Sequence, residues 1–321
     1  MIAAAGDGVR GHAVMVRHEY PFSTQTVHRR VKLAAAQRAG AAALLVVQPE
    51  AGVGPVSGSS GRAGGPGIPA MGISAEAGLA LRQPGARVHL RIVGEDLPRA
   101  RTDTLVLDLP AGPDAVPDER VVLSAHIDGH PLAESALDNA TGVAAAIALA
   151  RAFAPRMHAM RRGLTVCLFS AEEWALNGSR EWLAALPEAR RAAMALNVNL
   201  DSLAGSPRLT ALTSGFARLG EFARSGASLA GGALGVHLPL MSNSDHANFA
   251  ACGIPALRLI AGFDEPDSAL RLLLTPADTR ALVDENHLRA ATALAAGVLW
   301  HALRADSLAG LRNEARSEVR A

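Results

Sequence analysis

Blocks of apolar and polar residues follow one another along residues 99–321 and predict strands that alternate with helices. Short apolar runs are typical of buried strands, and they occur at residues 104–109, 120–125, 164–169, 195–200, 208–213 and 255–260. Longer stretches predict helices at 140–154, 177–186, 215–229, 245–252 and 284–304. This order predicts an α/β fold, in which a mixed, mostly parallel sheet carries helices on both faces.

Residues 1–98 show a different pattern, which predicts a small separate α+β domain. Strands are predicted at 11–17, 41–47, 68–73 and 86–93, and helices at 27–39 and 75–82. A polar joint at 97–101 separates this part from the rest of the chain. Because a chain of 321 residues usually forms two domains, we predict one domain at 1–98 and a second at 99–321.

The composition excludes several classes of protein. The chain holds 31 basic and 30 acidic residues, so its net charge of +1 gives no reason to expect a nucleic-acid partner. Apolar residues make up 49% of the chain, which is enough for a substantial core. With only two cysteines, a disulfide framework is excluded.

The chain carries no signal for a membrane. It lacks an apolar run of about 18 residues, so no transmembrane helix and no membrane partner are expected. Residues 1–5 lack the basic start and apolar centre of a signal peptide. We therefore expect a soluble protein, whose location and oligomeric state the sequence leaves unassigned.

Side chains that suit a metal follow three of the predicted strands. His126 and Asp128 follow the strand at 120–125, Glu172 and Glu173 follow 164–169, and Asp201 follows 195–200. Since open α/β folds keep their ligands at the carboxyl edge of the sheet, these residues are expected to lie close together. Imidazole and carboxylate together suit zinc. Asp128 is placed to accept a hydrogen bond from the other ring nitrogen of His126.

Two further features point to hydrolytic chemistry. Of the paired glutamates, one can bind a metal while its neighbour takes a proton from metal-bound water. Asp138 lies twelve residues after His126, just before an Ala-rich helix. A carboxylate that bridges two metals about 3.5–4 Å apart fits such a set of residues. The sequence therefore predicts a metal centre at this edge of the sheet.

Longer stretches resemble the co-catalytic zinc aminopeptidases, metallopeptidase family 28, whose wider group includes glutamate carboxypeptidases and glutaminyl cyclases. The matching segments are AHID, SALDNATGVAAAIALAR, LFSAEEWALNGSREW, NVNLDS, NSDHANFAACGIPALRL and LTPADTRALVD. The resemblance implies a hydrolase, a zinc-dependent exopeptidase, and most simply an aminopeptidase that removes N-terminal residues from small peptides.

The same resemblance implies a role for each residue of the site. His126 and Asp201 would bind one zinc, Asp138 would bridge, and Glu173 would bind a second zinc. Glu172 is similar to the general base of the family, which deprotonates zinc-held water and then passes the proton to the leaving amine.

The N-terminal part resembles the protease-associated domain. The matching segments are VMVR, QRAGAAALLVV and IPAMGISAEAGLAL. In families that carry it, this domain lies beside a peptidase site, shapes access to it and holds no catalytic residues. Relatives usually have peptidase-domain helices before the inserted domain and are often exported, so the chain is expected to be either truncated at its N-terminus or a minimal form.

The sequence departs from the family at Leu274. The family has a ligand histidine directly before Thr-Pro-x-Asp-Thr, and this chain has leucine there, followed by Thr275. The second zinc position thus loses its third protein ligand, and we predict one tight zinc. His130 and His246 are the candidates for a substitute ligand or a substrate contact.

Two other functions stay open. One is a cyclising acyltransferase like the glutaminyl cyclases, which work with a single zinc held at the position that Leu274 damages. The other is a weakly active peptide-binding protein on the peptidase scaffold. Retention of Glu172 argues against the second, because a binding protein has no need of a general base.

Overall fold

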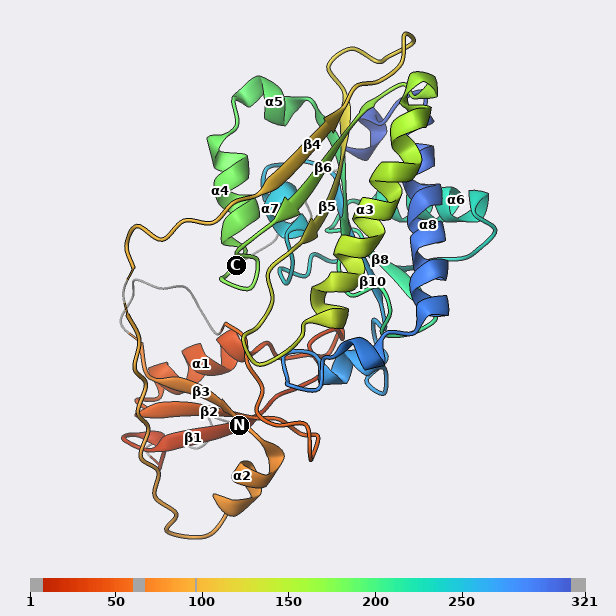
Figure 1. The fold of residues 1–321 in the computed structure, drawn as a ribbon. Coiled ribbons are helices and arrows are strands. Elements are labelled where there is room, and N and C mark those ends of the chain that lie inside the picture. The colour runs from red at the N-terminus through yellow and green to blue at the C-terminus, as the bar shows by residue number, and fades with distance from the viewer. Residues whose placement is uncertain (1–7, 60–66, 96, 313–321) are drawn as a thin grey trace.

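The computed structural model describes residues 8–59, 67–95 and 97–312, so the prediction about a signal peptide falls outside it. The chain forms a small N-terminal unit and a larger unit, each built on its own sheet (Figure 1). Across the described ranges, no helix combines the length and apolar character needed to cross a membrane. The exact boundary at residues 98 and 99 stays a prediction, and it lies in a stretch between two elements that belong to different units.

The N-terminal unit has a sheet of three parallel strands in the order β1-β2-β3. Its elements are β1 (Ala13–Arg17), α1 (Arg29–Arg38), β2 (Ala43–Val47), β3 (Ala70–Ile73) and α2 (Ala75–Ala80). The predicted strand at 86–93 is wrong: these residues, all described, form neither helix nor strand. Their apolar side chains are mostly exposed, and a strand needs a hydrogen-bonding neighbour that this segment does not find.

The larger unit has a sheet of seven strands in the order β4-β6-β5-β7-β10-β8-β9. The strands are β4 (Leu105–Leu109), β5 (Arg120–His126), β6 (Gly163–Phe169), β7 (Met194–Leu200), β8 (Leu209–Leu212), β9 (Gly235–His237) and β10 (Ala256–Ala261). The central strands β6, β5, β7 and β10 are parallel, whereas β4 and β8 run antiparallel to their neighbours β6 and β10. The predicted mixed, mostly parallel sheet is confirmed.

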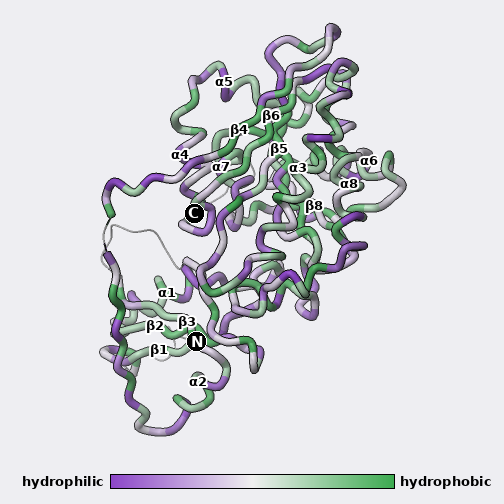
Figure 2. The backbone as a smooth tube through the Cα atoms, viewed as in Figure 1, coloured by the Kyte–Doolittle hydropathy of each residue, from purple (hydrophilic) through white to green (hydrophobic). Residues whose placement is uncertain are grey.

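Helices cover both faces of this sheet, as predicted (Figure 1). One face carries α3 (Thr141–Phe153), α6 (Ala217–Leu229) and α8 (Glu285–Arg304), and the other carries α4 (Asn177–Ala185), α5 (Glu188–Ala192) and α7 (His246–Ala251). Shorter helical turns span Ala136–Ala140, Ala154–Ala159, Ala269–Leu272, Arg280–Leu282 and Ala309–Leu311. Figure 2 shows the hydrophobic positions concentrated on the central strands, because strands covered on both faces are apolar throughout.

The N-terminal unit packs against loops at the carboxyl edge of the larger sheet. The Tyr20 hydroxyl lies 2.8 Å from the Ser268 hydroxyl, and the backbone N–H of Thr24 donates to Asp264 at 2.9 Å. The backbone N–H of Ser57 donates to the carbonyl oxygen of Leu274 at 2.6 Å. Apolar side chains from both units also form one buried cluster. The small unit is thereby held over the edge where the sequence predicts the metal centre.

Arg162 ties the start of β6 to the end of α8. Its side chain is fully buried, and its Nε donates to Glu119 Oε2 at 2.6 Å. Its Nη1 donates to the carbonyl oxygens of Ala302 and Ala305. We expect Arg162→Ala to lower the free energy of unfolding by about 3 kcal/mol, because it leaves these acceptors unpaired.

Urea unfolding of Arg162→Ala and Arg161→Ala provides a matched comparison. The neighbouring Arg161 pairs with Asp306, and their side chains are 42% and 97% exposed. Loss of that surface pair should cost less than about 1 kcal/mol. Equal losses of stability in the two variants would show that the buried contacts of Arg162 contribute no more to the free energy of unfolding than the surface pair of Arg161.

Candidate metal centre

The strands deliver the predicted ligand-type residues to one edge of the sheet. His126 is the last residue of β5, and Asp201 follows β7 directly. Glu172 and Glu173 lie three and four residues after the end of β6, and Asp138 lies in the helical turn that precedes α3. Because these strands are parallel, their carboxyl ends meet in one place.

Distances within the site are short. The Nε2 atom of His126 lies 3.1 Å from Asp138 Oδ1 and 3.8 Å from Asp201 Oδ1. Among the described residues, two sets of three place their ligand atoms within 4.8 Å of one another: His126, Asp138 and Glu173, and His126, Glu172 and Asp201. Asp138 thus falls in one set with Glu173, Asp201 falls in the other with Glu172, and His126 belongs to both.

Asp128 holds the segment that carries both glutamates. Its two carboxylate oxygens accept the backbone N–H groups of Glu172 and Glu173, each at 3.1 Å. The Nδ1 atom of His126 lies 3.1 Å from the backbone carbonyl of Asp128 and 3.5 Å from its carboxylate. Asp128 therefore positions three residues of the site, which is more than the contact to His126 that the sequence suggested.

Asp278 positions Asp138 through its backbone. The Asp278 carboxylate, 1% exposed, accepts the N–H groups of Leu137 at 2.8 Å and of Asp138 at 3.2 Å. The peptide bond between Asp138 and Asn139 is cis. The Asn139 side chain then caps the first turn of α3 by accepting the N–H of Gly142 at 3.0 Å. A Cβ at Gly142 would lie 2.4 Å from the backbone oxygen of Leu200, so only glycine fits there.

Asp201 is surrounded by donors. Its Oδ1 lies 3.0 Å from Arg258 Nη2 and accepts the Ser202 hydroxyl at 3.0 Å, and its Oδ2 accepts the Ser244 hydroxyl at 2.6 Å. Burial acts to raise the pKa of the Asp201 carboxyl, but the Arg258 guanidinium and these hydrogen bonds hold that pKa below its ordinary value. Asp201 is thus ionised and already faces one fixed positive charge.

The glutamates lack such compensation. Burial and nearby carboxylates raise the pKa values of Glu172 and Glu173 well above the ordinary value for glutamate. Burial opposes a charge on His126, yet Glu172 and the hydrogen-bonding aspartates raise the pKa of this histidine. A buried group of like charges is stabilised by a cation, because its members repel one another in a medium of low polarity.

Unpaired atoms also fit a metal. Glu173 Oε1 and His130 Nε2 are buried, and neither has a hydrogen-bond partner among the described residues. His130 Nε2 lies 2.6 Å from Glu173 Oε2, but the contact lacks hydrogen-bond geometry. Imidazole and carboxylate donors of this kind are the ligands that zinc takes at catalytic sites. The residues present therefore fit a zinc ion.

The two candidate substitute histidines differ in position. His130 contacts Glu173, as described above. His246 begins α7 and is completely buried, and it belongs to neither set of close ligand atoms. Burial and Arg258 lower the pKa of His246 to about 3. Leu274, at the position where the family resemblance implies a histidine, lines the same pocket as Asp138 and Glu173.

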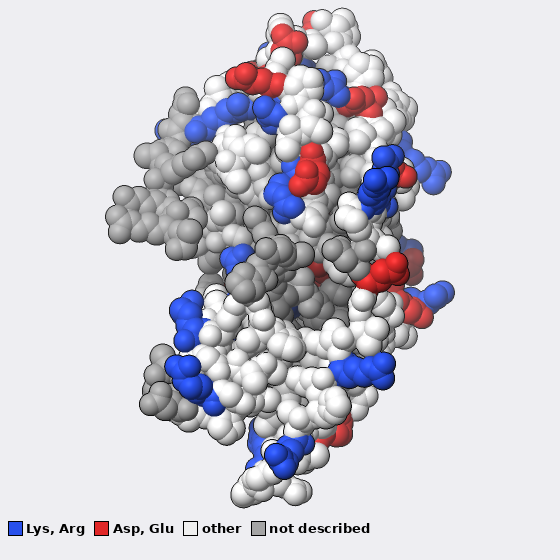
Figure 3. All heavy atoms as spheres, turned by 90° about the vertical axis from the view of Figure 1, so that its left-hand side faces the viewer, with Lys and Arg blue, Asp and Glu red and all other residues white. Residues whose placement is uncertain are grey.

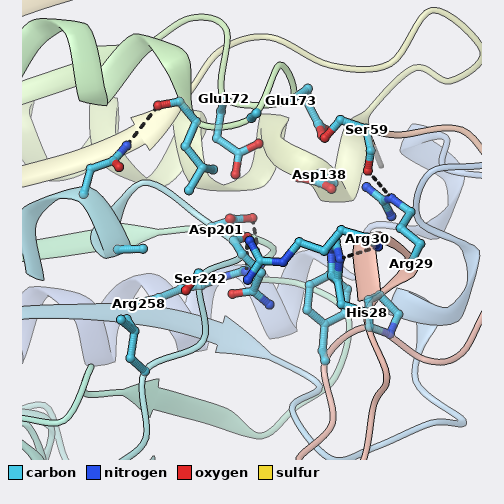
Figure 4. A pocket seen from close by; sticks show the side chains of 18 of the residues that line it. His28, Arg29, Arg30, Ser59, Asp138, Glu172, Glu173, Asp201, Ser242 and Arg258 are labelled. Carbon is cyan, nitrogen blue, oxygen red and sulfur yellow. Dashed lines mark hydrogen bonds and ion pairs between the residues drawn. The ribbon is translucent and has the colours of Figure 1, made fainter. Parts of the chain in front are cut away.

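The pocket over the site has a volume of about 540 Å³ and receives side chains from both units. Figure 4 shows the acidic residues on one side, with His28, Arg29 and Arg30 approaching from the N-terminal unit. Sequence analysis did not identify these three residues, because only the packing of the two units brings them to the site. It also missed Arg258, although a single charged residue inside the apolar segment 255–260 was a usable signal.

The molecular surface shows where the pocket opens and how charged side chains are distributed around it. Figure 3 shows that the surface is hollowed where the two units meet. On this face the N-terminal unit carries mainly Lys and Arg, whereas basic and acidic side chains are interspersed over the larger unit. The pocket itself receives Arg29 and Arg30 from the N-terminal unit, and the larger unit supplies both its carboxylates and Arg258.

Comparison with protein families assigns both units. The model of peptidase family M28 matches residues 105–299, and that of the PA domain matches residues 2–81. The chain belongs to peptidase family M28. This M28 protein is thus a metallopeptidase by family, and the predicted family and its N-terminal protease-associated domain are confirmed.

Solved structures share the fold of this M28 protein. A zinc aminopeptidase from Bacillus subtilis matches with a TM-score of 0.70 and 21% identity, over 95% of this chain and 72% of its own. An aminopeptidase from an Aneurinibacillus species matches with a TM-score of 0.66, 21% identity and the same coverage. A peptidase M28 precursor from Shewanella amazonensis matches with a TM-score of 0.67 and 19% identity, over 94% and 71%. No curated protein matches the M28 chain.

Proposed function

We propose that this protein is a zinc-dependent exopeptidase, and specifically an aminopeptidase that removes the N-terminal residue of small peptides. One observation carries the proposal: His126 brings its ligand atom within 4.8 Å of those of two carboxylate pairs, Asp138 with Glu173 and Glu172 with Asp201, and all four carboxylates line one pocket. Family membership supports the reaction class, and the zinc aminopeptidase from Bacillus subtilis supports the choice of metal and bond.

Zinc, when bound, would supply the positive charge that acidifies a water molecule and polarises the peptide carbonyl. Its ligands are drawn from His126, Asp138, Glu173 and Asp201, whose side chains present imidazole and carboxylate donors. The Asp128 and Asp278 carboxylates accept backbone hydrogen bonds from the segments that carry Glu173 and Asp138 and keep these ligands in place, as outer partners do at metal sites.

Glu172 is the proposed general base. Glu172 is 7% exposed and lines the pocket, and its backbone N–H is held by Asp128. Burial, with the charges around it, raises the pKa of Glu172, which brings a carboxyl closer to the range where it can both take and release a proton. Glu172 takes the proton of the attacking water and returns it to the leaving amine.

The pocket walls support action at a chain end. Arg29, Arg30 and Phe22 of the N-terminal unit line the pocket opposite the carboxylates. The acidic side suits a free amine of the substrate, and the arginines suit its carboxylate groups. A short peptide would place its amine at the metal centre and its remaining length toward α1.

The test uses purified protein supplied with zinc and a panel of aminoacyl-nitroanilides, their N-acetylated forms and dipeptides. We expect release of nitroaniline from free-amine substrates only, with loss of activity in a chelator and recovery on adding zinc back. Turnover of the N-acetylated forms at equal rates would exclude an aminopeptidase. Absence of turnover across the whole panel by zinc-loaded protein would reject the proposed activity.

One rival has an observation in its favour. Leu274 faces the pocket where the family has a ligand histidine, which favours a weakly active peptide-binding protein. Binding of a peptide to zinc-loaded protein without any cleavage would support this rival. The cyclising acyltransferase would be recognised by conversion of an N-terminal glutaminyl peptide.

A further inference from the structure

Arg258 lies buried inside a centre that otherwise suits a divalent cation. Its side chain is 1% exposed, and its Nη2 lies 3.0 Å from Asp201 Oδ1. Its Nη1 donates to the carbonyl oxygen of Asn243 at 3.1 Å, and its guanidinium lies over the ring of Phe22, 5.0 Å from the centroid. Figure 4 shows both Arg258 and Asp201 at the pocket. These contacts make the guanidinium a fixed part of the site.

The Asp201 carboxylate has little capacity left for a metal. Its Oδ1, which lies 3.8 Å from His126 Nε2, already receives Arg258 and Ser202. Its Oδ2 receives Ser244 at 2.6 Å. A zinc on Oδ1, at a bond length of about 2.1 Å, would lie no more than about 5 Å from the guanidinium nitrogen, and the two cations would repel each other.

The opposite side of the centre has free ligand atoms. The ligand atoms of His126, Asp138 and Glu173 lie within 4.8 Å of one another. Glu173 Oε1 is buried without a hydrogen-bond partner among the described residues, and His130 lies against its other oxygen. Two carboxylates and one imidazole form a three-ligand set with room for a fourth, which is the arrangement of a catalytic zinc site. This set does not need a histidine at residue 274.

We propose that the protein holds one zinc, bound by His126, Asp138 and Glu173, and that the Arg258 guanidinium takes the place of a second zinc at Asp201. His130 lies against Glu173 in this arrangement, with its Nε2 atom 2.6 Å from Glu173 Oε2. Leu274 and Arg258 have complementary effects in this arrangement. Leu274 replaces the histidine that the family resemblance implies as a ligand of a second zinc. The Arg258 guanidinium neutralises the Asp201 carboxylate, which would otherwise lack a positive partner. The inference rests on the zinc dependence of the proposed function.

Metal content distinguishes this arrangement from the one that the family resemblance implies. Zinc per chain and zinc affinity, measured by competition with a chelating dye, are compared for the unmodified protein, Glu173→Gln and Asp201→Asn. We expect one zinc in the unmodified protein, loss of tight binding in Glu173→Gln and retention in Asp201→Asn. Retention in Glu173→Gln with loss in Asp201→Asn would overturn the proposal.

The role of Arg258 is tested by a matched pair of substitutions. Arg258→Met removes the charge while keeping much of the length, and Arg258→Lys keeps the charge. We expect Arg258→Met to bind a second zinc at Asp201, and Arg258→Lys to stay at one. Cobalt titration of the unmodified protein, followed by absorbance, counts the sites without any substitution, so the proposal stays testable if a variant fails to fold.

The outcomes also separate this inference from the proposed function. Two tight metal ions in the unmodified protein would reject the Arg258 proposal, whereas zinc-dependent peptidase activity in that same preparation would leave the proposed function intact. One zinc without peptidase activity would support the arrangement and reject the activity. Absence of tight zinc binding in the unmodified protein would reject both.

Discussion

Glu172→Gln is expected to reduce peptidase turnover by roughly 10²–10⁴-fold while zinc stays bound, because glutamine keeps the size of the side chain and cannot carry a proton. The backbone hydrogen bond from residue 172 to Asp128 survives the change, so the segment that carries Glu173 should keep its position. The measurements are the kcat for an aminoacyl-nitroanilide and the zinc content of the same preparation.

Glu188→Gln is the matched control. Glu188 lies in the first turn of α5 and is exposed, so the same chemical change there should leave both turnover and zinc content as they are. Turnover of Glu172→Gln equal to that of the control would remove Glu172 from the mechanism. Loss of zinc from Glu172→Gln would instead make Glu172 a metal ligand, since its ligand atom also lies close to those of His126 and Asp201.

The main elements of the larger unit could be predicted because their patterns are strong. The strands β5, β6 and β7 are apolar along most of their length, since helices cover both faces of the sheet. The elements that were missed depend on their surroundings. β9 has three residues and exists through its pairing with β8, and α5 has only five residues, which leaves no periodic pattern to recognise.

The opposite error, at residues 86–93, has a related cause. Alternating apolar residues indicate a strand only when a neighbouring strand is available to take the backbone hydrogen bonds. The small sheet ends at β3, and this segment runs exposed between the two units. The periodicity of a sequence indicates which secondary structure a segment can form. Whether a strand forms depends on a neighbouring strand that can pair with it.

The position of the candidate site could be predicted from topology alone. His126 ends β5 and Asp201 follows β7, and parallel neighbouring strands bring their carboxyl ends together. The grouping of ligands within the site was not predictable in the same way. It depends on where the turn at Asp138 is held, and a carboxylate distant in sequence, Asp278, holds it.

The motifs also did not identify the arginines that face the acidic residues of the site. Arg29 and Arg30 reach the pocket through the packing of the N-terminal unit on the larger one. Arg258 lies on β10, which is the neighbour of β7, and this pairing brings its guanidinium to Asp201. A motif names residues of one segment, whereas the balance of charge in the site depends on which segments the fold brings together.

Asp138→Ala is expected to abolish tight zinc binding and, with it, peptidase activity. Asp138 is a ligand in the one-zinc arrangement and would be the bridging ligand in a two-zinc arrangement, so both lose an essential contact. Removing it should lower zinc affinity by more than the roughly 10–100-fold that outer hydrogen-bond partners contribute. The hydrogen bonds from Leu137 and residue 138 to Asp278 use backbone N–H groups, so the fold of this turn should persist.

Zinc titration and circular dichroism of Asp138→Ala, with Asp114→Ala as control, measure these effects separately. Asp114 is an exposed aspartate in the loop before β5, and its removal should change neither zinc affinity nor the spectrum. A folded Asp138→Ala protein that binds zinc as tightly as this control would exclude Asp138 as a ligand. The metal would then have to be held by His126, Glu172 and Asp201 beside the Arg258 guanidinium, which is the side of the centre least suited to a cation.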